Sequence, residues 1–165
     1  MNRHTCVIVY FSYTGNTRNL AHYIQKRLRC DLLSIVTKES YASEYEYLID
    51  PRVQDVHIEE FPALKKWSID LDGYDTVILC TPIWWFSLAP AVKSFLRNHD
   101  LKQKTIVPFI THGGYGLGHS IEDLRKLSPD ARILKVNEIP FTIRKMMISF
   151  EELNLMIKMI RDMEG

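Results

Sequence analysis

The sequence predicts a doubly wound α/β fold, a three-layer αβα sandwich built on a five-stranded parallel sheet. Five short apolar runs, rich in β-branched residues, do not alternate with polar residues, as expected of strands that are buried on both faces. Segments whose apolar residues repeat at helical spacing lie between these runs. A strand followed by a helix, repeated about five times, is typical of a parallel sheet with right-handed crossover connections.

The expected strands are spread along the whole chain. They are residues 6–11, 32–36, 76–80, 105–110 and 132–136. Pro108 lies inside the fourth of these strands, where it removes a hydrogen-bond donor from the ladder. We therefore expect a bulge or a strand end near this proline.

Two helices are predicted from apolar spacing and from a proline. Leu20, Ile24 and Leu28 repeat every four residues after the first strand. Pro90 follows the third strand and suits the first position of a helix, because the N–H that it lacks would have no intrahelical acceptor there.

Two more helices are predicted from capping residues. Ser120, with Asp123 behind it, resembles an N-cap with an acidic first turn. Ser149 and Glu152 have the spacing of a capping box, in which each side chain bonds the other residue's backbone N–H. We expect the capping box to open a C-terminal helix over residues 150–164.

The connector between the second and third strands, residues 37–75, is too long for a single loop. We expect at least one helix within it, around residues 59–67. The tyrosines Tyr41, Tyr45 and Tyr47 are expected to pack beside that helix.

Length and charge limit the function classes. A chain of 165 residues with 46% apolar residues fits one domain, residues 1–165. Its 21 basic and 20 acidic side chains nearly cancel, so the chain has no long-range field to gather nucleic acid or an anionic membrane. We expect neither kind of partner, and a charged ligand has to be captured locally.

The three cysteines, Cys6, Cys30 and Cys80, have no metal-type spacing. Two of them lie in apolar runs, and we expect buried, reduced thiols. No apolar run reaches the roughly 18 residues that a membrane-spanning helix needs, and the first residues show no signal-peptide pattern. The sequence therefore favours a cytoplasmic protein without a metal site.

The loop after the first strand is rich in small donors. Ser12, Thr14, Asn16 and Thr17 supply hydroxyl and amide groups, and Gly15 lets the backbone curl. The following helix directs free N–H groups and a partial positive charge into this loop, which suits a phosphate. Plain N-capping is the alternative interpretation.

The same loop lacks the groups that transfer a phosphate. It has neither the lysine of a Walker A motif nor the nucleophilic cysteine of a tyrosine phosphatase, and Thr81 stands where a response regulator carries its aspartate. We therefore expect the phosphate to be held and not transferred, and we assign no catalytic residue.

The loop after the third strand reads TPIWWFSLAP. Trp84 and Trp85 are adjacent, and two successive large aromatic side chains cannot easily both enter the core. We expect one of them, with Trp85 favoured, to line a crevice, while the other caps the core.

The loop after the fourth strand reads THGGYGLGHS. Its four glycines allow the backbone to approach a flat ligand closely, and Tyr115 offers a stacking face. A loop that is merely flexible is the alternative. His112 is expected to form local hydrogen bonds, and we assign it no proton transfer.

The three loops together resemble those of the flavodoxin family. The resemblance runs from about residue 5 to residue 136 and implies a sheet of order 2-1-3-4-5, non-covalently bound FMN, and electron transfer. It assigns the FMN phosphate to Ser12, Thr14, Gly15, Asn16 and Thr17. It places the isoalloxazine between two groups of residues, the first being Thr81, Pro82, Ile83, Trp84 and Trp85 and the second Thr111, His112, Gly113, Gly114, Tyr115 and Gly118.

Two departures from the family pattern bear on function. Phe86 stands where similar proteins often have a glycine, which lets a peptide reorient towards flavin N5 on reduction. Flavodoxins that shuttle electrons between proteins also tend to be strongly acidic, whereas this chain is nearly neutral.

Three functions follow from the resemblance. The first is a flavodoxin-type carrier that passes electrons from a reductase to a redox partner protein or a small acceptor. The second is an FMN-dependent NAD(P)H oxidoreductase that reduces quinones or similar small molecules. The third is a flavin-binding accessory domain without turnover, for which a methionine-rich tail would be the partner surface, namely Met146, Met147, Met156, Met159 and Met163.

Overall fold

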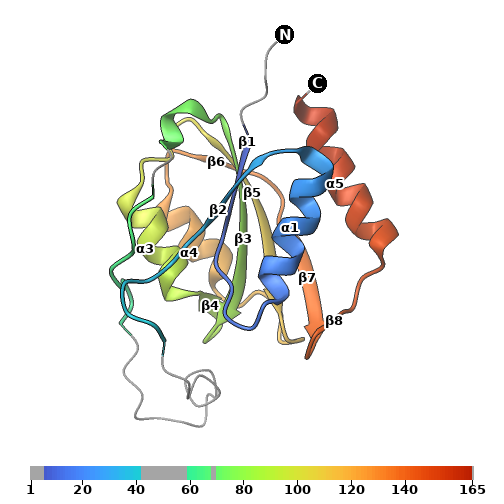
Figure 1. The fold of residues 1–165 in the computed structure, drawn as a ribbon, viewed down its shortest axis with the longest axis horizontal. Coiled ribbons are helices and arrows are strands. Elements are labelled where there is room, and N and C mark those ends of the chain that lie inside the picture. The colour runs from blue at the N-terminus through green and yellow to red at the C-terminus, as the bar shows by residue number, and fades with distance from the viewer. Residues whose placement is uncertain (1–5, 42–58, 68–69, 165) are drawn as a thin grey trace.

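A computed structural model describes residues 6–41, 59–67 and 70–164 of the chain. Within them, one mostly parallel sheet lies between two layers of helices (Figure 1). The predicted α/β sandwich is therefore confirmed.

The elements alternate along the chain much as the apolar runs predict. In order they are β1 (Cys6–Tyr10), α1 (Asn16–Leu28), β2 (Asp31–Ser34), the short 3₁₀ helix η1 (Leu71–Gly73), β3 (Thr76–Trp84), β4 (Ser87–Leu88), α3 (Pro90–Asn98), β5 (Thr105–His112), α4 (Ser120–Leu127), β6 (Arg132–Ile133), β7 (Asn137–Thr142), β8 (Lys145–Met146) and α5 (Phe150–Glu164).

The sheet has the order β2-β1-β3-β5-β7-β8, with β4 beside β3 and β6 beside β5. The strands β1, β2, β3, β5, β6 and β7 pair in parallel, and the two short strands β4 and β8 fold back antiparallel. The parallel order matches the expected 2-1-3-4-5 if β6 and β7 count as the fifth strand. The expected count of five strands was wrong, because the described residues form eight.

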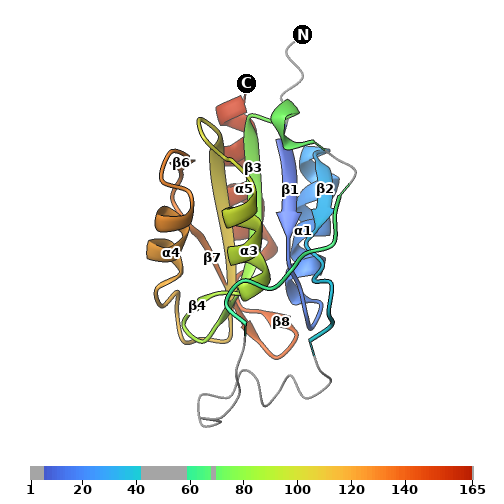
Figure 2. The same cartoon turned by 90° about the vertical axis from the view of Figure 1, so that its left-hand side faces the viewer.

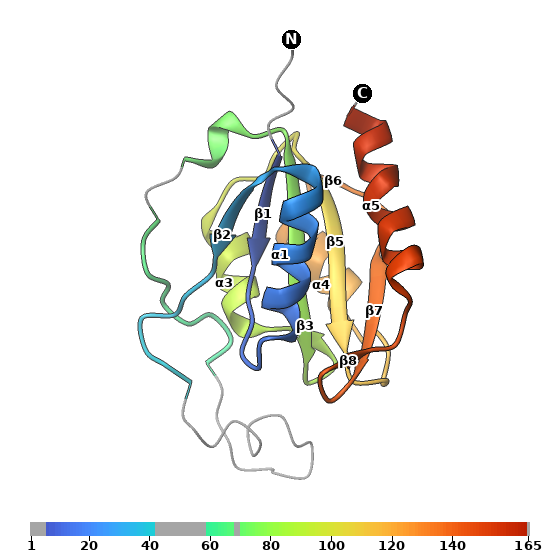
Figure 3. The same ribbon diagram turned by 45° about the vertical axis from the view of Figure 1, so that its right-hand side comes forward.

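Each face of the sheet is covered by one pair of helices. Helices α1 and α5 pack on one face, where Ile24 and Ile157 are buried with Ile78 of β3 (Figure 3). Helices α3 and α4 cover the other face, where Phe95 and Leu124 enter the core (Figure 2). All five side chains are at most 1% exposed, as continuous apolar strands require.

The fifth strand is interrupted opposite Pro108. The sequence predicts a continuous strand 132–136, but β6 ends at Ile133 and β7 begins at Asn137. Pro108 faces this gap, and its carbonyl accepts a hydrogen bond from Asn137 Nδ2 at 3.3 Å. The missing N–H of the proline therefore falls where no ladder partner is present, so β5 itself stays continuous.

The helix expected around residues 59–67 is absent, and this prediction was wrong. The segment runs extended beside the end of β2, where Leu64 bridges to Thr37 and Trp67 Nε1 donates to Ser34 O at 2.9 Å. Pro62 disfavours a helix at this point because it lacks an N–H. Tyr41 packs against Trp84, whereas Tyr45 and Tyr47 lie outside the described residues.

The predicted caps have mixed outcomes. Helix α3 begins at Pro90 as predicted. Ser120 is not the N-cap of α4 but its first residue, because His119 occupies the cap position and Ser120 Oγ donates back to Leu117 O at 2.6 Å.

The methionines of the C-terminal part divide between core and surface. Met146 and Met156 pack partly buried against the α1 and α5 side of the core. Met147, Met159 and Met163 are each more than half exposed.

The expectation of three reduced cysteines was wrong for two of them. Cys6, at the start of β1, and Cys30, after α1, form a disulfide with a Cα–Cα distance of 5.3 Å. Cys80 is free and fully buried in β3. The spacing of 24 residues gave no sign of the pair, which only the return of the chain through α1 brings together.

The capping box of α5 is confirmed and can be tested. Ser149 N donates to Glu152 Oε2 at 2.8 Å, and Glu152 N donates to Ser149 Oγ at 3.1 Å. We expect Ser149→Ala to lower the free energy of unfolding by about 1 kcal/mol, measured by urea denaturation, because it leaves a helix N–H without its acceptor. Ser149→Thr keeps the hydroxyl and should retain most of that stability. Equal loss in both variants would contradict the role of the cap.

Candidate functional site

The carboxyl ends of β1, β3, β5 and β7 meet at one edge of the sheet (Figure 3), the edge at which open α/β sheets bind ligands. Two neighbouring cavities of about 260 and 310 Å³ lie there and share the lining residues Ile83, His112 and Gly113, and we call the two together the edge cleft. Its further lining residues are Tyr13, Thr14, Asn16, Thr17, Pro82, Trp84, Trp85, Phe86, Thr111, Tyr115, Gly116, Phe141 and Ile143.

Most of the residues expected at a cofactor site line this cleft, so the structure brings the three predicted loops together. Ser12, Gly15, Thr81, Gly114 and Gly118 belong to the same loops but do not line the cleft. Tyr13, Phe141 and Ile143 line the cleft but were missed, and Phe86 and Gly116 of the predicted loops line it as well. For Phe141 and Ile143 the sequence gave no signal, because the hairpin of β7 and β8 was not expected.

One end of the cleft is formed by the start of α1. Gly15 adopts φ 103°, in the left-handed region, and α1 begins without a side-chain cap. Ser12 Oγ accepts the N–H of Gly15 at 3.2 Å, which closes the turn. The first N–H groups of α1 thus point into the cleft with the positive end of the helix dipole, which is a suitable site for an anion.

Two side chains of α1 connect this end to neighbouring strands. Thr17 is 2% exposed, and its Oγ1 lies 2.9 Å from Thr111 Oγ1 at the end of β5. Asn16 Nδ2 donates to Ile143 O at 2.7 Å, so its amide is directed to the turn between β7 and β8. Ile143 has φ 55°, which is unusual for a β-branched residue, and is 87% exposed.

The tryptophan pair divides as expected between core and cleft. Trp84 is 2% exposed and packs edge-on against Phe11 and Tyr41, with ring centroids 5.4 and 4.9 Å away. Trp85 is 37% exposed. The expectation of an irregular loop from Thr81 onward was wrong, because β3 continues to Trp84 and pairs with Ser87 across a two-residue turn.

The glycine-rich loop lies close against that turn. His119 N donates to Phe86 O at 2.6 Å, and a Cβ on Gly118 would lie only 2.1 Å from the same oxygen. Tyr115, at the tip of the loop, is 84% exposed and so has a free face towards the cleft. Only glycine at 118 permits this approach.

His112 lies between the two cavities and forms local interactions. Its Nδ1 accepts the N–H of Gly114 at 3.0 Å, and its Nε2 lies 2.8 Å from Glu138 Oε1. Nδ1 therefore acts as an acceptor, and the other ring nitrogen faces the carboxylate. The imidazole is thereby held in one orientation at the floor of the cleft.

Among the described residues, neither the free cysteine nor the buried Tyr41 supplies an ionised side chain at neutral pH. Burial raises the pKa of the Cys80 thiol, so it stays protonated at neutral pH. Burial also raises the pKa of Tyr41 to about 12, so its hydroxyl cannot act as a general base. The described part of the chain holds no group of three metal-ligating side chains. None of the helices in that part is long and apolar enough to cross a membrane.

A comparison with protein-family models decides the family. The model described as Flavodoxin matches residues 5–148, which is most of the chain. The chain belongs to the flavodoxin family. The resemblance seen in the three loops is therefore confirmed, and the family match extends beyond residue 136 to include β7 and β8.

Solved structures of flavodoxin-like proteins share this fold. A protein from Bacteroides eggerthii that is named a flavoprotein is 26% identical, with 95% of this chain and 98% of that chain covered and a TM-score of 0.77. A flavoprotein from Lactobacillus acidophilus, solved in complex with FMN, is 20% identical, with 82% and 93% covered and a TM-score of 0.67. Flavodoxin 2 from Bacillus cereus, in its oxidised form, is 18% identical, with 94% of each chain covered and a TM-score of 0.57. A comparison with curated proteins found no match.

The close approach of Gly118 to Phe86 can be tested by substitution. We expect Gly118→Ala to lower the free energy of unfolding by about 1–3 kcal/mol, because the new Cβ would overlap a backbone carbonyl that cannot move freely. Gly113→Ala, in the same loop, is the control, since its Cβ would meet no atom within 4 Å. Chemical denaturation of both variants provides the comparison, and equal stabilities would refute the contact.

Proposed function

We propose that this chain binds FMN in the edge cleft and carries electrons between a reductase and a redox acceptor. The observation that supports the proposal is the uncapped start of α1, which opens into a cleft with aromatic residues along its other end. An anion site next to a flat apolar slot suits a planar heterocycle that bears one phosphate. Family membership points to the same cofactor.

The residues of the cleft fit the parts of FMN. The N–H groups of the first turn of α1, with the hydroxyls of Thr14 and Thr17, would hold the phosphate. Trp85 and Tyr115, both exposed at the cleft, would flank the isoalloxazine. FMN supplies one- and two-electron redox chemistry when bound, and the protein binds the cofactor and tunes its environment. No nucleophile is needed, in agreement with the buried Cys80.

The carrier role is supported by the rim of the cleft. Trp85, Phe86 and Tyr115 are 37%, 49% and 84% exposed, so they form an apolar rim around the slot assigned to the ring. Such a rim suits close contact with a second redox protein, because aromatic residues are enriched in protein interfaces. We therefore propose a redox partner protein as the physiological contact.

A second candidate is an FMN-dependent NAD(P)H oxidoreductase that acts on small acceptors. It is favoured by the nearly balanced 21 basic and 20 acidic side chains, because dedicated carriers use charge to steer docking. A small acceptor needs no such steering.

The cytoplasmic location stays a prediction. The expectation of reduced cysteines no longer supports it, since Cys6 and Cys30 form a disulfide and disulfides are rare in the cytoplasm. We retain the cytoplasm because a reductase-fed carrier works where the reductant is made.

The phosphate assignment predicts the effect of removing two hydroxyls. We expect Thr14→Val combined with Thr17→Val to weaken FMN binding by about 2–4 kcal/mol, since hydrogen bonds to a charged group contribute about 1.5–3 kcal/mol each and rarely add fully. Calorimetric titration measures the change. Riboflavin, which lacks the phosphate, is the matched ligand and should lose much less. Unchanged FMN affinity would place the phosphate elsewhere.

Anaerobic titration distinguishes the two candidate functions. For a carrier, NADPH alone should leave the flavin spectrum unchanged, and adding a separate reductase should bleach it. Rapid bleaching by NADPH alone would instead support the oxidoreductase. A flavin that neither donor system reduces would contradict both roles and favour an accessory domain.

A further inference from the structure

The turn between β3 and β4 is held in a conformation that its residues disfavour. Trp85 has φ 52° and Phe86 has φ 58°, as in a type I′ turn, which needs two left-handed residues. Asn and Gly are the usual residues there, because large side chains in this region cost free energy. The surrounding structure must therefore supply contacts that favour this conformation of the Trp85–Phe86 turn.

The first contact comes from the cap of α4. His119 N donates to Phe86 O at 2.6 Å, and His119 is the N-cap residue of that helix. Gly118 leaves the space in which the carbonyl lies. The peptide between Phe86 and Ser87 cannot rotate without breaking this bond.

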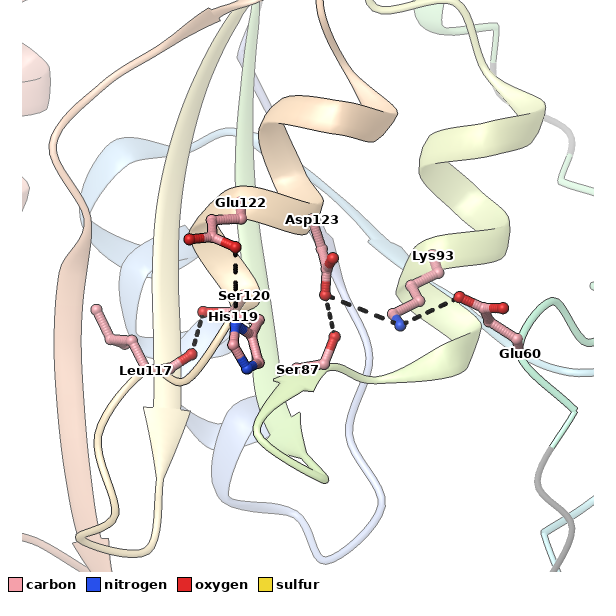
Figure 4. A network of polar contacts seen from close by, with 8 residues as sticks. All are labelled: Glu60, Ser87, Lys93, Leu117, His119, Ser120, Glu122 and Asp123. Atoms are coloured by element: carbon pink, nitrogen blue, oxygen red, sulfur yellow. Dashed lines mark hydrogen bonds and ion pairs between the residues drawn. The ribbon is translucent and has the colours of Figure 1, made fainter.

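The second contact comes from Asp123 in the first turn of the same helix. Ser87 Oγ donates a hydrogen bond to Asp123 Oδ2 (Figure 4). The same carboxylate oxygen lies 3.9 Å from Lys93 Nζ of α3, and Lys93 lies 3.6 Å from Glu60 Oε1. The side chains of Lys93 and Asp123 are 15% and 23% exposed, so this interaction is partly shielded from water.

Both contacts start within the first turn of α4 and end on consecutive residues of the hairpin. Phe86 is held through its carbonyl and Ser87 through its hydroxyl. Lys93 fixes the carboxylate that accepts the second bond. The two contacts together fix the direction in which Trp85 and Phe86 project, and both of these side chains line the edge cleft.

We propose that Asp123 is a positioning residue for the flavin site: with Lys93 and the N–H of His119, it holds the strained Trp85–Phe86 turn in place and so preorganises one wall of the cleft. The inference rests on the proposed function, since it assigns the wall to the isoalloxazine. Preorganisation strengthens binding because the wall does not have to be ordered when the ligand arrives.

The experiment compares Asp123→Ala with Glu122→Gln. Glu122 is the neighbour on the same helical turn, but its carboxylate lies 3.6 Å from the exposed ring of His119 and does not reach the hairpin (Figure 4). We expect Asp123→Ala to raise the dissociation constants of FMN and of riboflavin alike, each about tenfold, because the wall contacts the ring and not the phosphate. Glu122→Gln should bind both flavins as the wild type does.

A second pair of variants distinguishes the hydroxyl contact from general damage. Ser87→Ala should reproduce the weaker binding of both flavins, and Ser87→Thr, which keeps the hydroxyl, should restore it. If Ser87→Thr binds as poorly as Ser87→Ala, or if Asp123→Ala affects FMN and not riboflavin, the inference is wrong.

A readout without flavin tests the strain directly. Phe86→Gly places a residue that adopts positive φ freely, so the turn needs the clamp less. We expect Asp123→Ala to shift the NMR signals of the Trp85 amide and indole N–H in the flavin-free wild-type background, because the strained turn relaxes, and to shift them clearly less in Phe86→Gly. Equal shifts in the two backgrounds would overturn the inference. If the wild type takes up no flavin, the proposed function fails, whereas this cycle still decides whether Asp123 holds the turn.

Discussion

The site depends on how the start of α1 is placed at the end of a strand buried on both faces. The chain leaves β1 and turns through Gly15 at φ 103° into a helix whose first N–H groups have no side-chain cap. Because β3 and β5 pair with their neighbours in parallel, their ends reach the same edge as that helix start. A local anion site thus arises in a protein whose formal net charge of +1 is too small to attract an anion from a distance.

The start of α1 and the Trp85–Phe86 turn differ in what stabilises their backbone conformations. The start of α1 is what its own residues favour, since glycine suits the left-handed turn. The Trp85–Phe86 turn is disfavoured by its own residues and persists because His119 and Asp123 hold it. Strained residues of this kind gather at functional sites, where the surrounding fold supplies the compensating contacts.

The sequence predicted the fold class and the three loops because those signals are local. Apolar runs mark strands, and glycines and hydroxyls mark the turn into α1. The hairpin after Trp84 was missed because Trp85 and Phe86 lack the Asn-Gly signature of its turn. The Cys6–Cys30 disulfide was missed because its two segments meet only in the folded chain. The helix expected at 59–67 overlooked Pro62, and the pairing of Leu64 with Thr37 that replaces it is also a tertiary contact.

The most direct test of the account is a comparison of two ligands on the wild-type protein. Calorimetric titration of the purified, flavin-free chain with FMN and with riboflavin measures what the phosphate adds to binding. The account predicts one FMN bound per chain, with riboflavin bound at least about a hundredfold more weakly, because the phosphate meets the positive end of α1 and charged hydrogen bonds are strong. Equal affinity for the two ligands, or no binding of either, would contradict it.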